Sequence, residues 1–422
     1  MTPLGPFRTS DVHVPDPYPL YEHYREHDPV HEGEDGWYVF RHDDVAAVLA
    51  DRRFGRGGLP APLPADCPHL RRTASAWMVF MDPPRHTRVR ALVARSFTPR
   101  VVERLRPRVD DIAGRLTAAL AEEQRADLVD RFAAPFPILV ISELLGVRAD
   151  DRPWFRARAV DLQQATSARA RRRSDAFRVA DAAARDLDAY FRTELARRRA
   201  AEEGPTGDGD LITALLRGAD GKPPADEERL GYEERPADEE PLGDDVLVGT
   251  CVHLLTAGHE TTTNLLCKGL LALLAHPYQL GLLRTRPELM PAAVEELIRY
   301  DSPVQMISRR AHEDGEIAGR RVRKGDKVTL VLGSANRDPR RFPHPDRLDI
   351  RRDARRHCGF GLGIHYCVGA PLARAEAEIG LGRLLRGLPG LRLAEEEPDG
   401  PVRYADDLVF HGPSRMVVRT RY

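Results

Sequence analysis

The residues with the clearest chemical potential lie in the stretch 358–374, which reads CGFGLGIHYCVGAPLAR. Three glycines flank its second cysteine: Gly361, Gly363 and Gly369. Because glycine tolerates backbone conformations that side chains forbid, this loop can wrap closely around a large flat ligand set against Cys367. Pro371, near the start of a run rich in Ala, Leu, Arg and Glu, predicts a helix whose first turn carries or follows the cysteine. The unpaired amides and positive end of that helix favour a thiolate at Cys367.

The same stretch resembles the iron-ligand signature of the cytochrome P450 family, with every fixed position filled. The matching residues are Phe360, Gly361, Gly363, His365, Cys367 and Gly369. The resemblance implies that the Cys367 thiolate is the axial ligand of a haem b iron and pushes electron density toward bound O2, which favours O–O cleavage. It also implies cofactor-binding roles for Phe360, His365 and Gly369, with His365 as a ligand of a haem propionate.

Two other interpretations of this stretch need no haem. Cys358, His365 and Cys367 could be zinc ligands, or the loop could hold a buried and inert cysteine. Zinc sites usually show paired short spacings such as Cys-x2-Cys with a second pair elsewhere, and the sequence contains none. Further matches, in the order that the family requires, favour haem ligation.

A second stretch with unusual chemistry lies inside a long apolar run, from Asp244 to His276. The run predicts a helix buried on most sides, yet its middle reads AGHETT at residues 257–262. Gly258 removes a side chain where a ligand could approach, and Thr261 can divert a backbone carbonyl from its helical bond. The segment resembles the family's Ala-Gly-x-Asp/Glu-Thr motif. This implies that Gly258 lies against the haem, and that Glu260 and Thr261 relay protons to oxygen in a site that excludes water.

The resemblance assigns further cofactor contacts. His86 and Arg90 are four residues apart and share one face of a predicted helix, as in the family's His-x3-Arg pair, which hydrogen-bonds a haem propionate. Arg309 matches a second propionate ligand. His259 is expected to face neighbouring helices rather than the iron.

Other matches concern the support of the site and its substrate. A buried charge cluster, in which one carboxylate between two guanidiniums satisfies many hydrogen bonds, is expected to fix the chain before the cysteine loop. Its members are Glu296, Arg299 and Arg347. Substrate contacts are expected from the long helix, from an extended segment after Pro303 and from a turn near the carboxyl end. The candidates are Leu255, Val304, Gln305, Ile307 and Val409.

These residues must be positioned by a mainly α fold with a small β region, predicted as a single domain over residues 1–422. Its first elements are a helix over 19–27, strands over 30–32 and 37–40, and a helix over 43–49. A long loop follows over 54–80, which the resemblance places over the substrate. An acidic surface loop at 218–245 contains a short internal duplication, because residues 224–231 recur almost unchanged as 236–243.

Composition limits the classes of function. A hydrophobic content of 42% suffices for a sizeable core, and a net charge of −1 gives no reason to expect a nucleic-acid partner. The amino terminus lacks the features of a signal peptide, and no run reaches ~18 apolar residues, so neither secretion nor a membrane span is predicted. The five irregularly spaced cysteines fit a reducing cytoplasm better than a disulfide framework. We expect a cytoplasmic monomer.

The motifs together predict a monooxygenase that inserts one oxygen atom from O2 into a small organic substrate. The resemblance suggests a secondary-metabolite intermediate of polyketide or macrolide type, free or bound to a carrier. Since no reductase domain is fused, electrons are expected from NAD(P)H through a separate ferredoxin and ferredoxin reductase. Basic segments around the cysteine loop are candidates for docking that ferredoxin. They carry Arg88, Arg95, Arg100, Arg352, Arg355, Arg356 and Arg374.

Two alternative functions use the same cofactor. A haem-thiolate enzyme could use peroxide or catalyse a rearrangement, but such an enzyme needs no proton relay, and the intact pair Glu260 and Thr261 disfavours it. A non-catalytic haem sensor would be expected to carry an effector or DNA-binding module, and none is visible in the sequence.

Overall fold

The computed structural model describes residues 7, 15–59, 63–165, 175–200, 210–219 and 242–421. The chain divides into two compact units. The first, here called the cysteine-loop unit, comprises Met1–Leu59, Arg106–Pro137 and Glu260–Tyr422, and the second unit comprises Pro60–Leu105 and Ile138–His259. Three of the four passages between the units fall inside helices rather than linkers. A single domain remains our prediction.

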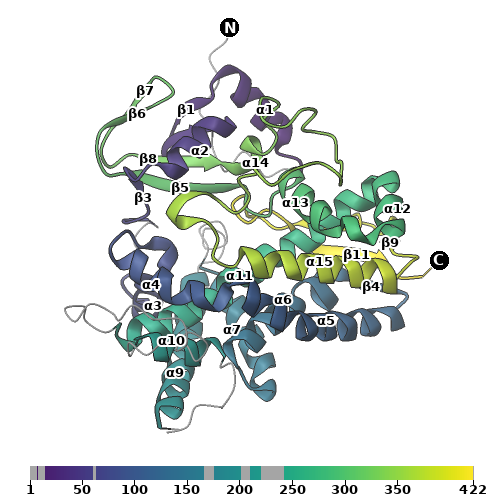
Figure 1. Ribbon diagram of the computed structural model, residues 1–422, viewed down its shortest axis with the longest axis horizontal. Coiled ribbons are helices and arrows are strands. Elements are labelled where there is room, and N and C mark those ends of the chain that lie inside the picture. Colours follow the sequence, from purple (N-terminus) through teal and green to yellow (C-terminus); the bar gives the residue numbers. More distant parts are fainter. Residues whose placement is uncertain are drawn as a thin grey trace. The chain divides into compact units, whose positions relative to one another are not determined.

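A five-stranded sheet forms part of the cysteine-loop unit (Figure 1). Its strands, in spatial order, are β1 (Val30–Gly33), β2 (Gly36–Val39), β8 (Lys327–Val331), β5 (Met306–Ala311) and β3 (Phe54–Gly55). β2 and β8 are parallel, and the other neighbours are antiparallel. The helices beside the sheet are α1 (Tyr18–His27), α2 (His42–Ala50) and α14 (Leu332–Ala335). The short helices and strands predicted near the amino terminus are therefore confirmed.

The core of this sheet connects two parts of the expected site. Val328 and Leu330 of the central strand β8 are fully buried and belong to one apolar cluster. Val304, two residues before β5, and Ile307, the second residue of β5, pack against that cluster. Leu362 of the cysteine loop packs against it as well. The sheet thus holds the extended segment before β5 and the cysteine loop against a common core.

The remaining elements of the cysteine-loop unit are helical, apart from a small sheet and a hairpin. The sheet has the strand order β10 (Val402–Tyr404), β11 (Pro413–Arg419) and β4 (Arg125–Asp127), with β9 (Arg392–Leu393) also paired to β11, and the hairpin is β6 (Gly315–Ile317) with β7 (Arg320–Val322). The helices are most of α5 (Pro99–Glu122), a π-helix (Val129–Ala133), α12 (Pro277–Thr285), a 3-10 helix (Pro287–Leu289), α13 (Met290–Tyr300), a 3-10 helix (Gly363–His365) and α15 (Ala370–Gly387).

The second unit is built from helices and 3-10 turns. They are α3 (Pro68–Ser75), Met78–Phe80, α4 (Arg85–Ala94), Arg95–Phe97, most of α6 (Pro135–Leu145), Ala149–Asp151, α7 (Arg152–Gln163), α9 (Ala176–Ala200) and α10 (Leu211–Ala219). The prediction of a long loop over 54–80 was wrong where β3, α3 and the 3-10 helix Met78–Phe80 form. Pro68 occupies a first-turn position there, and Leu70 and Ala74, four residues apart, are both buried. Most of the acidic loop predicted at 218–245 lies outside the described residues.

The long helix α11 (Asp244–Ala275) agrees closely with the predicted run. It begins with two acidic residues, which suit the positive end of a helix. Most of its residues are buried, but Ala257 is exposed, and Gly258 and Thr261 are partly exposed. Within the described chain, no single helix is long and apolar enough to cross a membrane; only the sharply bent pair α11 and α12 meets that length and composition together.

Candidate active site

The cysteine loop is held in a compact shape by its own backbone. Gly361 and Gly363 have φ values of 69° and 70°, so both need the left-handed conformation that glycine allows. The Cys367 amide donates to the Phe360 carbonyl at 2.9 Å, which closes the loop on itself. A Cβ on Gly363 would lie 2.4 Å from the Leu49 carbonyl oxygen, so this glycine permits close packing on α2 rather than the approach of a ligand.

Exposure separates the five thiols. Cys67, Cys251, Cys267 and Cys358 are buried, whereas Cys367 is exposed. Burial raises the pKa of Cys358 to about 12, so this thiol is protonated and a poor metal ligand. Cys367 lies three residues before the first residue of α15, where helix amides and the helix dipole favour a thiolate. Cys367 is therefore the thiol best suited to bind iron.

The zinc interpretation of this stretch finds no support in the described residues. Among them, no three His, Cys, Asp or Glu side chains gather in a way that could hold a metal ion. An iron held by a porphyrin needs only one protein thiolate, so this finding leaves the haem interpretation intact.

An ion-pair network that the sequence analysis did not identify braces the cysteine loop. Arg374, the fifth residue of α15, donates to Glu295 of α13 at 2.6 Å and to the Tyr366 hydroxyl at 3.2 Å. Its guanidinium lies 4.5 Å from the ring centre of Phe360. Burial alone would raise the pKa of Glu295, but hydrogen bonds from His357 and Arg374 lower it to about 2. Arg374 is thus a loop brace, and its charge is offset by Glu295.

The predicted charge cluster before the loop forms, with one correction. Arg299 donates to both oxygens of the fully buried Glu296 carboxylate, at 2.7 and 2.9 Å. The second guanidinium comes from Arg352, whose Nε lies 3.1 Å from Glu296 Oε1, and not from Arg347 as predicted. Arg347 is exposed and contributes its backbone carbonyl to Arg352. His344 has a φ of 50°, in the left-handed region, three residues before Arg347. The motif spacing did not predict this local backbone conformation.

The middle of α11 carries the predicted catalytic pair. Glu260 is mostly buried and Thr261 is partly exposed. A Cβ on Gly258 would meet no atom within 4 Å, so the helix surface there is open. The helix is uninterrupted through Thr261. His259 forms a 3.0 Å hydrogen bond with Gln163 of α7, which confirms that it faces a neighbouring helix.

A buried carboxyl group behind this pair escaped the sequence analysis. Thr262 donates to Glu376 Oε2 at 3.0 Å, which joins α11 to α15, the helix that follows Cys367. Burial raises the pKa of Glu376 to about 8, although the hydrogen bond from Thr262 lowers it. A glutamate among the apolar residues of α15 was the available signal, but spacing alone could not show that it faces α11.

The predicted propionate ligands lie in both units. His86 and Arg90 share one face of α4 in the second unit, and burial together with the Arg90 charge lowers the pKa of His86. Arg309 on β5 is almost fully buried, and its Nη1 donates to the Ser308 carbonyl at 3.1 Å. His365 ends the 3-10 helix of the cysteine loop and is partly exposed. Within the cysteine-loop unit, a thiol at Cys367, an imidazole at His365 and a guanidinium at Arg309 are groups that fit an iron porphyrin that carries carboxylates.

The predicted substrate contacts differ in accessibility. Val304 and Ile307 are partly buried, and Val409 is 39% exposed. The backbone N–H of Gln305 donates to the Val409 carbonyl at 3.0 Å, which joins the segment before β5 to the segment that contains Val409. The Gln305 side chain is buried, and its Nε2 donates to the Tyr18 hydroxyl and the Ser302 carbonyl, so this group supports the fold. Leu255 in the second unit is fully buried.

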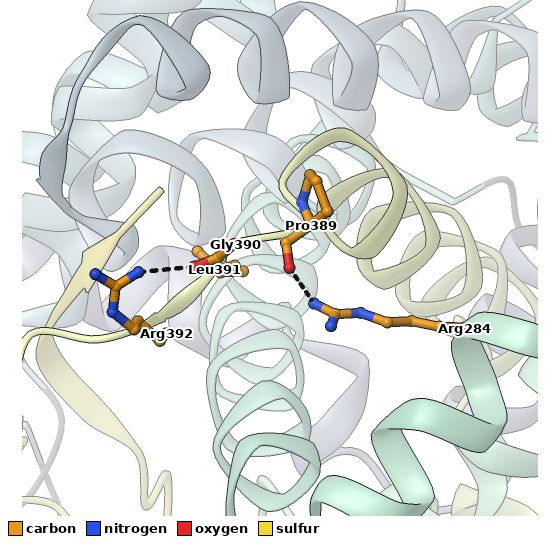
Figure 2. Close-up of a pocket in the computed structure, with 5 residues that line it drawn as sticks. All are labelled: Arg284, Pro389, Gly390, Leu391 and Arg392. Atoms are coloured by element: carbon orange, nitrogen blue, oxygen red, sulfur yellow. Dashed lines mark hydrogen bonds between the residues drawn. The ribbon is translucent and has the colours of Figure 1, made fainter. Parts of the chain in front are cut away.

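A shallow surface pocket lies apart from these residues (Figure 2). It is lined by Arg284, Pro389, Gly390, Leu391 and Arg392. Arg284 of α12 donates to the Pro389 carbonyl at 3.0 Å, and Arg392 donates to the Gly390 carbonyl at 3.3 Å. Both guanidiniums thus fasten the chain between α15 and β9, and none of the predicted site residues lines this pocket.

Comparisons with known proteins agree with the geometry. The family model described as Cytochrome P450 matches residues 283–389, which include the charge cluster and the cysteine loop. The chain is 41% identical over 416 residues to the cytochrome P450 monooxygenase PikC of Streptomyces venezuelae, covering 96% of this chain and 91% of that protein. It is 36% identical to the 6-deoxyerythronolide B hydroxylase of Saccharopolyspora erythraea, covering 99% of each.

A solved structure shows the same fold. The crystal structure of P450BioI in complex with an acyl carrier protein ligated to hexadec-9Z-enoic acid matches with a TM-score of 0.85 at 33% identity. The match covers 98% of this chain and all of that one. The mainly α fold with a small β region, predicted from the sequence, is therefore confirmed.

Proposed function

This chain belongs to the cytochrome P450 family and is a haem-thiolate monooxygenase, and from that premise we propose that Cys367 is its iron ligand and that it oxidises a macrolactone. One observation supports the ligand assignment above all. Cys367 is the exposed thiol, in a loop that closes on itself at the start of α15, while the other four cysteines are buried.

The residues around the proposed ligand have separable tasks. The haem, when bound, supplies the binding and reductive activation of O2. Arg309, His365 and the pair His86 and Arg90 are suited to hold its propionates by charge-assisted hydrogen bonds. Thr261 can hold a water with its hydroxyl, and Glu260 can pass protons to that water from outside the buried helix.

The proposed substrate is a polyketide-derived macrolactone. Its support is the similarity, over almost the whole chain, to a 6-deoxyerythronolide B hydroxylase. The half-buried aliphatic side chains Val304 and Ile307, together with Val409, suit an apolar ring better than a charged substrate. A carrier-bound substrate is the second candidate, supported by the similarity to P450BioI, which was crystallised with a loaded acyl carrier protein.

The proposed electron donors are a ferredoxin and its NAD(P)H-dependent reductase, and the proposed location is the cytoplasm. The five cysteines, none of which forms a disulfide, support a reducing compartment. Electrostatic docking has less support than the sequence suggested, because three of the expected arginines are paired with acids. These pairs are Arg352 with Glu296, Arg355 with Asp353 and Arg374 with Glu295.

Turnover with isotopically labelled O2 tests the function. With ferredoxin, reductase and NADPH, 6-deoxyerythronolide B should gain one labelled oxygen atom per molecule. A linear acyl chain held as a thioester on an acyl carrier protein tests the second candidate in the same assay. Product that forms only when peroxide replaces the electron donors, and that carries no oxygen from the labelled O2, would support the peroxide-using alternative. Haem binding without oxidation of any macrolactone or carrier-bound substrate would favour a sensor.

A further inference from the structure

A lysine lies in the interior of the cysteine-loop unit, although the chain draws its positive charge almost entirely from arginine. The lysines are Lys222, Lys268, Lys324 and Lys327, among 64 basic residues. Lys268 lies on α11, and its side chain has no exposed surface. An ammonium in the protein interior is tolerated only where acceptors replace its water, so its partners define its role.

Three acceptors surround the Lys268 ammonium. Asp301 Oδ1 lies 2.7 Å from Nζ, the Ser302 carbonyl oxygen 2.9 Å and His411 Nδ1 3.1 Å. An ammonium has three N–H bonds and no acceptor, so these partners match its donors in number. Because Nζ can only donate, His411 accepts through Nδ1. The Tyr18 hydroxyl also donates to Asp301 Oδ1, at 2.7 Å.

These acceptors belong to the two segments that carry the candidate substrate contacts. Asp301 and Ser302 lie within six residues before Val304 and Ile307, and His411 lies two residues after Val409. The hydrogen bond from the Gln305 amide to the Val409 carbonyl joins the same two segments. Lys268 therefore binds both of these joined segments. Their aliphatic side chains Val304, Ile307 and Val409 remain partly exposed.

The helix that carries Lys268 also carries the proposed proton relay. Asn264 lies three residues after Thr261 and four before Lys268, so the three share one face of α11. Asn264 Nδ2 donates to the Phe410 carbonyl at 3.1 Å, one residue before His411. Asn264 and Lys268, on the two turns of α11 that follow Thr261, thus both bind the segment that contains Val409.

We propose that Lys268 is a positioning residue for substrate. It fastens the segments 301–307 and 408–411 to the face of α11 that carries Thr261, and so sets where Val304, Ile307 and Val409 lie relative to Thr261. The inference rests on the proposed function, because that function gives these segments their contact with substrate. Burial lowers the pKa of Lys268 while Asp301 raises it, which is consistent with an ion pair held away from water.

Two ligands of different size test the proposal. Imidazole reaches only the iron, whereas clotrimazole also fills the space in front of it, and both shift the haem absorption when they bind. In Lys268→Met, the dissociation constant of clotrimazole should rise about tenfold while that of imidazole stays within about twofold, because the iron is unaffected. Amide exchange at Gln305 should accelerate by about tenfold or more, because its bond to Val409 opens more often.

Two further variants make the test decisive. Lys327→Met removes a lysine paired with Asp35 at 2.6 Å, outside this network, and should keep the wild-type values. Lys268→Met combined with Asp301→Asn removes both charges, so it avoids an uncompensated, partly buried carboxylate and should retain the clotrimazole defect. An unchanged clotrimazole constant in both folded variants, or an equal loss for the two ligands, would overturn the proposal. A wild-type protein that binds neither ligand would instead overturn the proposed function.

Discussion

At the scale of single residues, the molecule distinguishes chemically similar groups by burial. Cys358 and Cys367 are nine residues apart, yet one is sealed among apolar side chains and the other is exposed at a helix start. Glu295 and Glu376 are both buried, but hydrogen-bond donors keep the first ionised while burial raises the pKa of the second to about 8. Environment, more than residue type, assigns the chemistry.

Glu376 makes the stability of the protein depend on pH. Its pKa rises from 4.5 in the unfolded chain to about 8 in the folded protein, so the folded state binds the extra proton between these values. Its favourable contribution is complete below the lower value and is lost as the pH rises through the higher one. Glu376→Gln should remove this loss, which amounts to at most about 1.4 kcal/mol per pH unit.

Urea unfolding at a series of pH values measures the effect. The free energy of unfolding of Glu376→Gln should fall less steeply than that of the wild type from mildly acidic to mildly alkaline pH. Glu378→Gln, on the same helix and paired with Arg106, is the matched control and should keep the wild-type slope. Parallel slopes for wild type and Glu376→Gln would show that Glu376 does not hold this proton.

Thr261 is predicted to control how efficiently electrons yield product. Thr261→Ala should still bind substrate and accept electrons, because the hydroxyl supports neither step. It should release more peroxide per product formed, because the water that delivers protons is no longer held. Peroxide and product measured against NADPH consumed give the result, and a wild-type product yield per electron would exclude the relay role.

At the scale of elements, the segment before the cysteine loop depends on one fully buried carboxylate. Glu296 accepts from Arg299, from Arg352 and from the Asp349 amide at 3.0 Å. Arg352 also donates to the Pro343 and His344 carbonyls. Because it binds Glu296 of α13 as well, it attaches the segment 343–352 to that helix. The cluster thus orders the chain leading to the loop.

The two candidate arginines should therefore differ in their contribution to stability. Arg352→Met should lower the free energy of unfolding by about 2 kcal/mol or more, because it removes hydrogen bonds to a buried charge and to backbone carbonyls. Arg347→Met should change it by no more than about 0.5 kcal/mol, because that side chain is exposed. Denaturant titration of both variants decides the assignment, and equal losses would restore Arg347 as a partner.

At the scale of the whole molecule, the sequence predicted what depends on local pattern. The periodicity of 244–276 and the turn residues of 19–49 located their elements to within one or two residues. The sequence did not predict which charged residues pair in the interior. The pairing of Glu296 with Arg352 instead of Arg347, and of Lys268 with His411, depends on how distant segments of the chain fold back on one another. The helix at 68–75 was missed because its apolar face is only two turns long.

The central claim, that Cys367 ligates the haem iron, is tested most directly by the absorption spectrum of the reduced, CO-bound protein. Cys358→Ser is the matched control, since that thiol is buried and has a pKa raised to about 12. Cys358→Ser should keep the thiolate-type band of the wild type, and Cys367→Ser should lose it while the protein remains folded by circular dichroism. Retention of the thiolate-type band in Cys367→Ser would contradict the assignment.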